Sequence, residues 1–200
     1  MHHPASLPFD GGPIYAVVFW LAYLLWVVTE LVRNQKRRPA AADKRDRKSF
    51  MVLRVALSLA LILDFAFALL LPGAAFGGAA YALFVAGIGC ILAGMALRGY
   101  AVAVLGRFFT VEVATRVGQE VIEAGPYRYI RHPAYTGALL SLIGITLALG
   151  NWAGVIEMLV LSGPAFGYRI AVEEAALLSA LGEPYAHYMR RTWRLVPGMV

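Results

Sequence analysis

Three long apolar stretches in the first half of the sequence constrain the fold more than any other feature. Residues 79–97 form a run without a single charged residue, and residues 14–32 and 50–71 are almost as apolar. A helix of about 20 apolar residues is long enough to cross a bilayer. Hydrophobic residues make up 60% of the chain and its mean hydropathy is +0.67, which is outside the usual range of soluble domains. We therefore expect an all-α, polytopic integral membrane protein.

Two shorter apolar stretches lie in the second half of the sequence. Residues 135–149 and 152–168 are joined by Gly150-Asn151, and each is somewhat short for a straight span. We interpret the pair as a tight helical hairpin, tilted or in a locally thinned bilayer. The total is then five transmembrane helices, and residues 170–181 continue the last one as helix up to Gly182.

The segments between these runs indicate how the chain is organised. We interpret residues 1–13 as a short, loosely ordered tail and residues 98–131, which alternate polar and apolar side chains, as an amphipathic connector at the membrane surface. We divide the chain into an N-terminal portion with three spans, residues 1–104, and a C-terminal portion with the hairpin, residues 105–200.

Small residues in the third span predict that it approaches another helix closely. They recur at helical spacing, as Ala86, Gly89, Cys90, Ala93 and Gly94. Cys90 is the only cysteine of the chain, which excludes an internal disulfide and a cysteine-based zinc cluster. We interpret it as a packing residue and predict no metal site.

The basic residues are distributed asymmetrically. With five spans, all 18 Lys and Arg fall on one side of the membrane, in residues 33–54, 98–131 and 169–200. Positively charged loops stay in the cytoplasm, so we expect the N-terminus outside and the C-terminus in the cytoplasm of a prokaryotic cell. The sequence pI of 9.7 then reflects topology and contact with anionic membrane lipids rather than nucleic-acid binding.

Two polar clusters stand out on the basic side. The segment GPYRYIRHPAYTG, residues 125–137, packs two prolines, three tyrosines, two arginines and His132 into thirteen positions before an apolar run. Arg169, Glu173 and Glu174 follow the hairpin. These residues could act only as lipid-facing anchors and an aromatic belt.

Two details favour a binding site instead of simple anchoring. His132-Pro133 removes a backbone donor where a helix enters lipid, and backbone groups freed there must face protein or a cavity. Adjacent glutamates beside a membrane helix are costly unless they are paired or bound to a ligand. We therefore predict a site at which a charged ligand meets the membrane.

The polar clusters resemble the C-terminal signature of the isoprenylcysteine carboxyl methyltransferase family, whose wider relatives include the phospholipid N-methyltransferases. The matching residues are Gly125-Pro126-Tyr127 and RHPxYxG from Arg131 to Gly137, followed in order by Arg169, Glu173-Glu174, Leu177, Gly182, Tyr185 and Tyr188. The resemblance covers about residues 105–197 and implies a catalytic region there. It implies transfer of a methyl group from S-adenosylmethionine to a lipophilic acceptor at the cytosolic membrane face.

The resemblance also implies roles for individual residues. Glu173 corresponds to an acidic residue that contacts the cofactor, and Arg169 to an arginine assigned to the carboxylate of the acceptor. The other cofactor-side positions are Gln119, Glu120, Val121, Ile122, Tyr127, His132, Pro133, Ala134 and Tyr135. The chemistry agrees, because an acid can pair with the cationic cofactor and aromatic rings can hold its adenine. Methyl transfer is a direct displacement, so catalysis is mostly positioning.

The sequence leaves the acceptor and some residue roles open. A carboxylate acceptor of the isoprenylcysteine type needs no general base, whereas a phospholipid amine or a small thiol would need one. His132 could be that base, but we favour a cofactor contact or a local structural hydrogen bond. We interpret Asp64 and Glu157 as packing or partner-bonded residues away from the site, and leave the role of Glu112 open.

Two other classes of function compete with methyl transfer. Sterol reductases share a similar C-terminal region and bind a nicotinamide cofactor there, although their chains are longer. A non-catalytic membrane protein could also keep such a motif for folding, because fold and function are separable.

Overall fold

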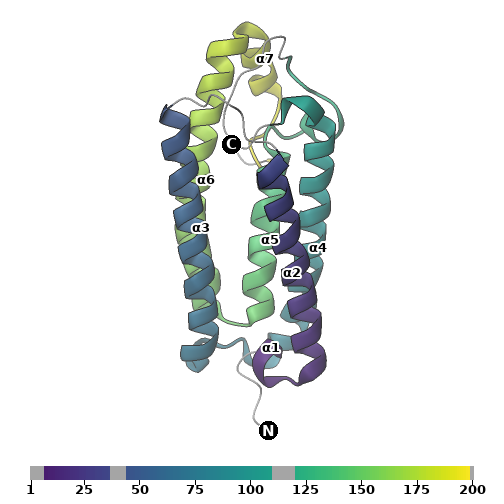
Figure 1. Ribbon diagram of the computed structural model, residues 1–200, viewed down its shortest axis with the longest axis vertical. Helices are drawn as coiled ribbons and strands as arrows, with labels where there is room; N and C mark the ends of the chain where they lie inside the picture. The colour runs from purple at the N-terminus through teal and green to yellow at the C-terminus, as the bar shows by residue number, and fades with distance from the viewer. Residues whose placement is uncertain (1–6, 37–43, 110–119, 199–200) are drawn as a thin grey trace.

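The described chain consists of helices that run along one long axis (Figure 1). The computed structural model describes residues 7–36, 44–109 and 120–198. The α-helices in these ranges are α1 (Leu7–Asp10), α2 (Pro13–Lys36), α3 (Lys44–Leu70), α4 (Ala80–Leu105), α5 (Pro133–Leu149), α6 (Trp152–Leu181) and α7 (Glu183–Arg191). Short 3-10 turns connect them, η1 (Pro72–Ala74), η2 (Gly77–Ala79), η3 (Gly106–Phe108) and η4 (Gly125–Arg128).

Four helices, α2, α3, α4 and α6, are long and apolar enough to cross a membrane. The apolar helix α5 has 17 residues, which corresponds to about 25 Å at 1.5 Å per residue. The prediction of an all-α, polytopic membrane protein is confirmed at this level, while α5 stays a predicted fifth span.

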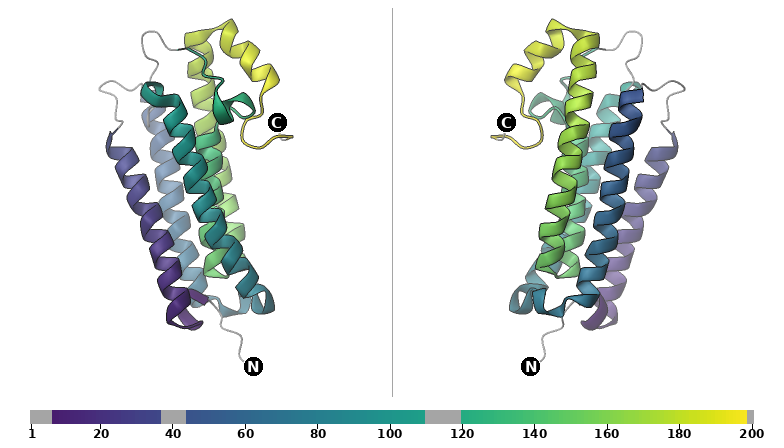
Figure 2. Two further views of the ribbon diagram at one scale, coloured as in Figure 1. Left: turned by 90° about the vertical axis from the view of Figure 1, so that its right-hand side faces the viewer. Right: turned by 90° about the vertical axis from the view of Figure 1, so that its left-hand side faces the viewer.

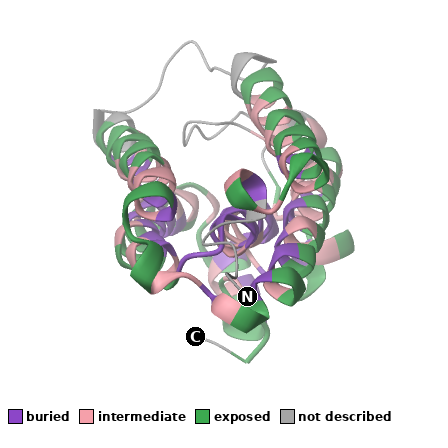
Figure 3. Cartoon of the chain, turned by 90° about the horizontal axis from the view of Figure 1, so that it is seen from below, coloured by how far each residue is buried: buried purple, intermediate pink, exposed green. Residues whose placement is uncertain are grey.

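Helix α5 lies inside the bundle rather than at its surface. Every one of its residues is buried or half-buried. The other long helices turn exposed apolar residues outward, and the buried residues gather between the helices (Figure 3). Because α5 is surrounded by protein, its length is set by its neighbouring helices more than by the lipid around the bundle.

Glycines allow α4 and α5 to touch along their backbones. A Cβ at Gly94 would lie 2.4 Å from the carbonyl oxygen of Gly137, and a Cβ at Gly87 would lie 2.6 Å from that of Gly144. The predicted close approach of the third span is therefore confirmed at Gly94. Gly89 belongs to the same predicted pattern of small residues, but a Cβ added there would have no atom within 4 Å. The contact face is set by Gly87 and Gly94, seven residues apart.

The predicted hairpin is present, but its two helices do not pack mainly on each other. Gly150 adopts a positive φ of 83° and ends α5, and Asn151 caps α6 by accepting a hydrogen bond from the Ala153 N–H at 2.9 Å. The Asn151 amide also donates to the carbonyls of Phe67 and Leu71, each at 2.9 Å. Beyond the turn, α5 packs chiefly against α4 and α6 against α3. The two helices of the predicted C-terminal portion therefore pack chiefly on helices of the N-terminal portion.

Two segment boundaries differ from the predictions. Residues 7–10, which we assigned to a loosely ordered tail, form the turn α1, and Phe9 packs against the core cluster around Phe19. The connector does not begin at residue 98, because apolar residues 101–105 carry α4 on until Gly106 ends it with a φ of 52°. Pro13 stands at the first position of α2, where a proline is well tolerated.

The segments with and without Lys and Arg lie at opposite ends of the bundle. The turns 72–79 and 150–151 and helix α1 form the end near the N-terminus, whereas α7 and the C-terminal segment form the other end (Figure 2). A backbone hydrogen bond of 3.0 Å from Phe76 to Gly150 joins the two uncharged turns. The site described next lies at the basic end.

Candidate functional site

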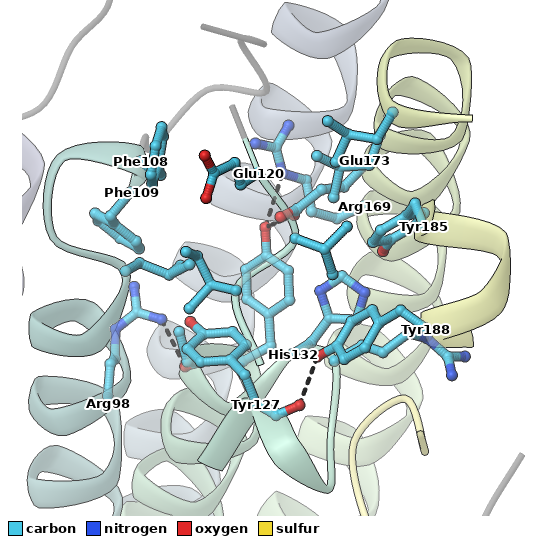
Figure 4. A pocket seen from close by; sticks show the side chains of 18 of the residues that line it. Arg98, Phe108, Phe109, Glu120, Tyr127, His132, Arg169, Glu173, Tyr185 and Tyr188 are labelled. Atoms are coloured by element: carbon cyan, nitrogen blue, oxygen red, sulfur yellow. Dashed lines mark hydrogen bonds between the residues drawn. The ribbon is translucent and has the colours of Figure 1, made fainter. Parts of the chain in front are cut away.

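A pocket opens at the basic end of the bundle, among the ends of α3, α4, α5 and α6 and beside α7 (Figure 4). Its empty space, with the open mouth included, is about 1140 Å³. Its walls mix acids, arginines, phenols and large apolar side chains. The lining residues are Phe50, Leu53, Arg98, Leu105, Phe108, Phe109, Glu120, Val121, Ile122, Tyr127, Arg131, His132, Ala134, Tyr135, Arg169, Glu173, Leu177, Leu181, Tyr185 and Tyr188.

The segment 125–137 forms one wall because the C-terminal segment runs alongside it. The Arg131 N–H donates to the Trp193 carbonyl at 2.7 Å, and the Trp193 N–H donates to the Tyr129 carbonyl at 3.0 Å. Gly125 begins η4 with a φ of 56°, a conformation that L side chains rarely adopt. Pro133 then opens α5, where its missing N–H removes no helical hydrogen bond. The unusual composition of this segment thus reflects a turn that leads directly into a buried helix.

A charged cluster crosses the pocket from α5 to α6. The Tyr135 hydroxyl donates to Glu173 Oε2 at 2.6 Å and accepts from Arg169 Nε at 3.2 Å. Arg169 is only 1% exposed, and its Nη1 donates to Ser49 Oγ at 2.8 Å. Its guanidinium also lies over the Phe50 ring, 5.8 Å from the centroid. Helix α3 therefore helps to fix the arginine, although nothing in that apolar run predicted it.

The two adjacent glutamates have different surroundings. Glu174 does not line the pocket; it is 4% exposed and its carboxylate lies 2.7 Å from Arg131 Nε, 3.3 Å from His132 Nε2 and 3.1 Å from Arg194 Nε. Arg131 also donates to the carbonyls of Met189 and Thr192 in and after α7. Glu174 thus links α6, the 125–137 segment and the C-terminal segment, whereas Glu173 faces the pocket.

His132 is buried beneath the pocket and its ring stacks on Tyr135, with centroids 5.5 Å apart. Its Nε2 lies 3.3 Å from Glu174 Oε1, within hydrogen-bond distance. His132 also lines the pocket, and its favoured role as a cofactor contact or a local structural hydrogen bond stays a prediction.

Three phenols complete the wall near α7. Burial, with a further effect of Glu173, raises the pKa of Tyr127 well above its usual range, and burial does the same for Tyr185 and Tyr188. They stay neutral hydrogen-bond donors. The Tyr188 hydroxyl uses its donor on the Tyr127 carbonyl at 2.7 Å, which ties α7 to η4.

The structure brings together most of the residues that the sequence singled out. The predicted residues that line the pocket are Glu120, Val121, Ile122, Tyr127, His132, Ala134, Tyr135, Arg169 and Glu173. Pro133 is buried behind the wall rather than in it. Gln119 and Glu112 lie outside the described residues. The functional roles of all these residues stay predictions.

Sequence reasoning missed part of the wall. Arg98 was assigned only to the connector, yet it lines the pocket and donates from Nη1 to the Ala134 carbonyl at 2.8 Å. The available signal was its position as the first charge after an uncharged span. Phe50 and Leu53 were also missed, because an apolar side chain in an apolar run carries no signal of its own. Phe108 and Phe109, in the predicted connector, were missed as well.

The intramembrane acids Asp64 and Glu157 lie away from the pocket lining. Asp64 is fully buried and packs against Gly154, where a Cβ would lie 2.1 Å from its Oδ1. Within the described part of the chain, the carboxylate oxygens of both acids have no hydrogen-bond partner. The packing interpretation of Asp64 therefore fits better than the partner-bonded one.

The fold and the site define an all-α membrane protein with a charged and aromatic ligand pocket at one end of its helices. Residues 87–179 match the family model described as the isoprenylcysteine carboxyl methyltransferase (ICMT) family. The match spans 93 of the 200 residues, and over this region the chain is similar to that family.

Curated proteins are also similar to part of this chain. The chain is 30% identical over 112 residues to protein-S-isoprenylcysteine O-methyltransferase of Schizosaccharomyces pombe, covering 55% of this chain and 48% of that protein. It is 31% identical to protein-S-isoprenylcysteine O-methyltransferase B of Arabidopsis thaliana, over 56% of this chain and 57% of that protein. The chain thus matches about half the length of these curated relatives.

A solved structure shares the fold. It is described as the eukaryotic intramembrane Ras methyltransferase ICMT without a monobody, and it matches 100% of this chain and 69% of its own with a TM-score of 0.66 and 22% identity. At this identity the similarity shows a common architecture, in which all the described helices take part.

Proposed function

We propose that this chain is a membrane-embedded methyltransferase that uses S-adenosylmethionine and methylates the carboxylate of a lipophilic, isoprenylcysteine-type acceptor. The observation that carries the proposal is the contact among Glu173, Tyr135 and Arg169 in one pocket. The Glu173 carboxylate, which suits a cationic methyl donor, thereby lies one helical turn from the Arg169 guanidinium, which suits an anionic methyl acceptor. The match to the family model and the names of the relatives support the same chemistry.

The residues present fit the donor. When bound, S-adenosylmethionine supplies a methyl group activated by a positively charged sulfur. Glu173 and Glu120 bring carboxylates to the same end of the pocket, as Figure 4 shows, and can balance the positive charges of the donor. Tyr127, Tyr185 and the phenylalanines of the wall offer flat apolar surface for the adenine. The donor-side positions that the sequence predicts thus supply both charge and aromatic surface.

Arg169 suits the acceptor carboxylate because it is held in place before any ligand arrives. Ser49, Tyr135 and the Phe50 ring fix its guanidinium, and a planar fork can hold a carboxylate with two parallel hydrogen bonds. Phe50 and Leu53 of α3 add apolar wall on that side, where a hydrocarbon tail can pack.

An ionised carboxylate already carries the electron pair that forms the new bond to the methyl carbon. The protein therefore has to orient the acceptor, keep the positive donor paired and exclude water, and it needs no general base. The position of His132 among Glu174 and Tyr135 agrees with a mechanism in which it moves no proton.

A methyl-transfer assay tests the proposal. Purified protein in phospholipid nanodiscs is supplied with S-adenosylmethionine that is tritiated at the methyl group and with N-acetyl-S-farnesylcysteine. We expect a methyl ester, which mild base releases as labelled methanol; the same acceptor with its carboxylate already esterified is the matched control. Base-stable label on phospholipid amines would identify the alternative acceptor, and no labelled product of either kind would refute methyl transfer.

We also propose that five helices cross the membrane, with the N-terminus outside and the basic end in the cytoplasm. The proposal rests on the gathering of uncharged turns at one end and basic residues at the other. Gly73 is exposed with nothing within 4 Å of a built Cβ, and the Arg190 side chain is 61% exposed, so both accept a cysteine.

The topology test uses these two positions in a Cys90→Ser background. An impermeant thiol reagent should label Gly73→Cys in intact cells and Arg190→Cys only after permeabilisation. The reverse pattern would invert the topology, and labelling of both from outside would reject the five-span arrangement.

A further inference from the structure

An ion-pair network joins the last turns of α2 to the pocket. Glu30 Oε1 lies 2.6 Å from Arg33 Nη1 on its own helix and 2.8 Å from Arg98 Nε on α4. The Glu30, Arg33 and Arg98 side chains are only 18%, 16% and 15% exposed. Arg98 lines the pocket and also donates from Nη1 to the carbonyl of Ala134. One carboxylate on an outer helix thus contacts a guanidinium of the pocket wall.

Helix α2 has few other ways to influence the site. Only 11% of the most apolar stretch of α2 is buried, and none of the side chains of α2 that the structure describes lines the pocket. A glutamate near the end of an apolar helix is costly unless it is paired, and Arg33 on the same helix could provide that pairing alone. The contact from Glu30 to Arg98 therefore needs a separate explanation.

Glu30 lies between two arginines that would otherwise repel each other. Arg33 reaches toward α4, since a Cβ at Gly99 would lie 3.8 Å from its Nη2. Without the carboxylate, Arg98 would face the positive charge of Arg33 and lose its ion-pair partner, whose Oε1 lies 2.8 Å from Nε without the alignment of a hydrogen bond. The Ala134 carbonyl alone cannot fix a planar group that turns about several bonds.

We propose that Glu30 is a positioning residue that holds the Arg98 guanidinium in the pocket wall, where Arg98 binds a ligand carboxylate. The inference rests on the proposed function, which brings two carboxylates to the pocket, one on the amino-acid part of S-adenosylmethionine and one on the acceptor. Arg169 suits one of them, and Arg98 lies on the opposite side of the pocket (Figure 4). A guanidinium carries five N–H donors, so its contacts with Glu30 and Ala134 leave donors for a ligand.

A double-mutant cycle tests this coupling. Glu30→Gln, Arg98→Gln and the double variant are compared in nanodiscs by calorimetric titration with S-adenosylmethionine and by the acceptor KM in the farnesylcysteine assay. We expect Glu30→Gln and Arg98→Gln to weaken the same parameter, roughly 5- to 30-fold for Glu30→Gln. The double variant should be no worse than Arg98→Gln. A change in donor affinity would assign Arg98 to the donor carboxylate, and a change in the acceptor KM to the acceptor carboxylate.

Arg33→Gln is the matched control, because it removes the other partner of Glu30 and leaves the contact with Arg98. We expect it to leave both parameters within about twofold. Additive losses in the double variant would overturn the proposal, as would a Glu30→Gln protein with a lower Tm and wild-type constants. If wild-type protein neither binds S-adenosylmethionine nor transfers methyl, the proposed function itself fails; if it does both and the cycle is additive, only the role of Glu30 fails.

Discussion

Substituting the two adjacent glutamates should separate ligand binding from folding. Glu173→Gln keeps the side-chain shape, and its amide oxygen can still accept the 2.6 Å hydrogen bond from Tyr135. What it loses is the negative charge next to the cationic donor. A hydrogen bond to a charged group contributes about 1.5–3 kcal/mol, so S-adenosylmethionine affinity should fall roughly 10- to 150-fold. The melting temperature should change little.

Glu174→Gln should show the opposite pattern. Its carboxylate has 4% exposure and pairs with two buried partners, Arg131 and His132. Breaking a buried ion pair by removing one partner costs about 3–5 kcal/mol. The third pair, with the 47% exposed Arg194, adds little because solvent screens it. We therefore expect a clear loss of thermal stability.

Calorimetric titration and thermal unfolding of both variants in the same detergent provide the comparison. Titration is carried out well below the unfolding transition, so that Glu174→Gln is measured as folded protein. If Glu174→Gln lost donor affinity at unchanged stability, or if Glu173→Gln unfolded early and bound normally, the division between the two glutamates would be refuted.

Two further predictions concern the helix contact and the acceptor. Gly94→Ala places a Cβ against the Gly137 carbonyl and should lower the free energy of unfolding by about 1–3 kcal/mol. In Gly89→Ala the new Cβ meets open space, so this variant should be neutral or stabilising by up to about 1 kcal/mol. If denaturant titrations gave equal losses of unfolding free energy for both variants, the close contact of α4 with α5 at Gly94 would be contradicted. Arg169→Lys should raise the acceptor KM or lower kcat, because an ammonium cannot reproduce the planar fork, yet leave S-adenosylmethionine affinity within about twofold. Collapse of donor affinity in Arg169→Lys would place this arginine on the donor side.

The helices could be predicted from the sequence because their signals are local. Apolar runs fix where a spanning helix can lie, and Gly150, Gly182 and Pro13 mark where helices begin or end. The pairing of the helices depends on distant residues. The Gly87 contact with Gly144 requires knowing which faces of α4 and α5 meet, and small residues on α4 point in more than one direction.

The site was predictable where one short segment carries several polar residues. Segment 125–137 and the pair Glu173-Glu174 stand out in an apolar chain. The residue types alone do not show which of the two glutamates faces the pocket. That difference arises because Arg131 and Arg194 approach α6 from the 125–137 and C-terminal segments. Glu30 and Arg98 were missed for the same reason: each looks like an ordinary charge at the end of a span until the packing of α2 on α4 joins them.

Titration of the purified wild-type protein with S-adenosylmethionine and, separately, with NADPH tests the central claim most directly. The pocket combines acids that suit a cationic donor with aromatic surface, so we predict saturable binding of S-adenosylmethionine at one site per chain. NADPH, which carries several negative phosphate charges, should not bind at the same concentrations. Saturable NADPH binding without S-adenosylmethionine binding would contradict the account and indicate a reductase.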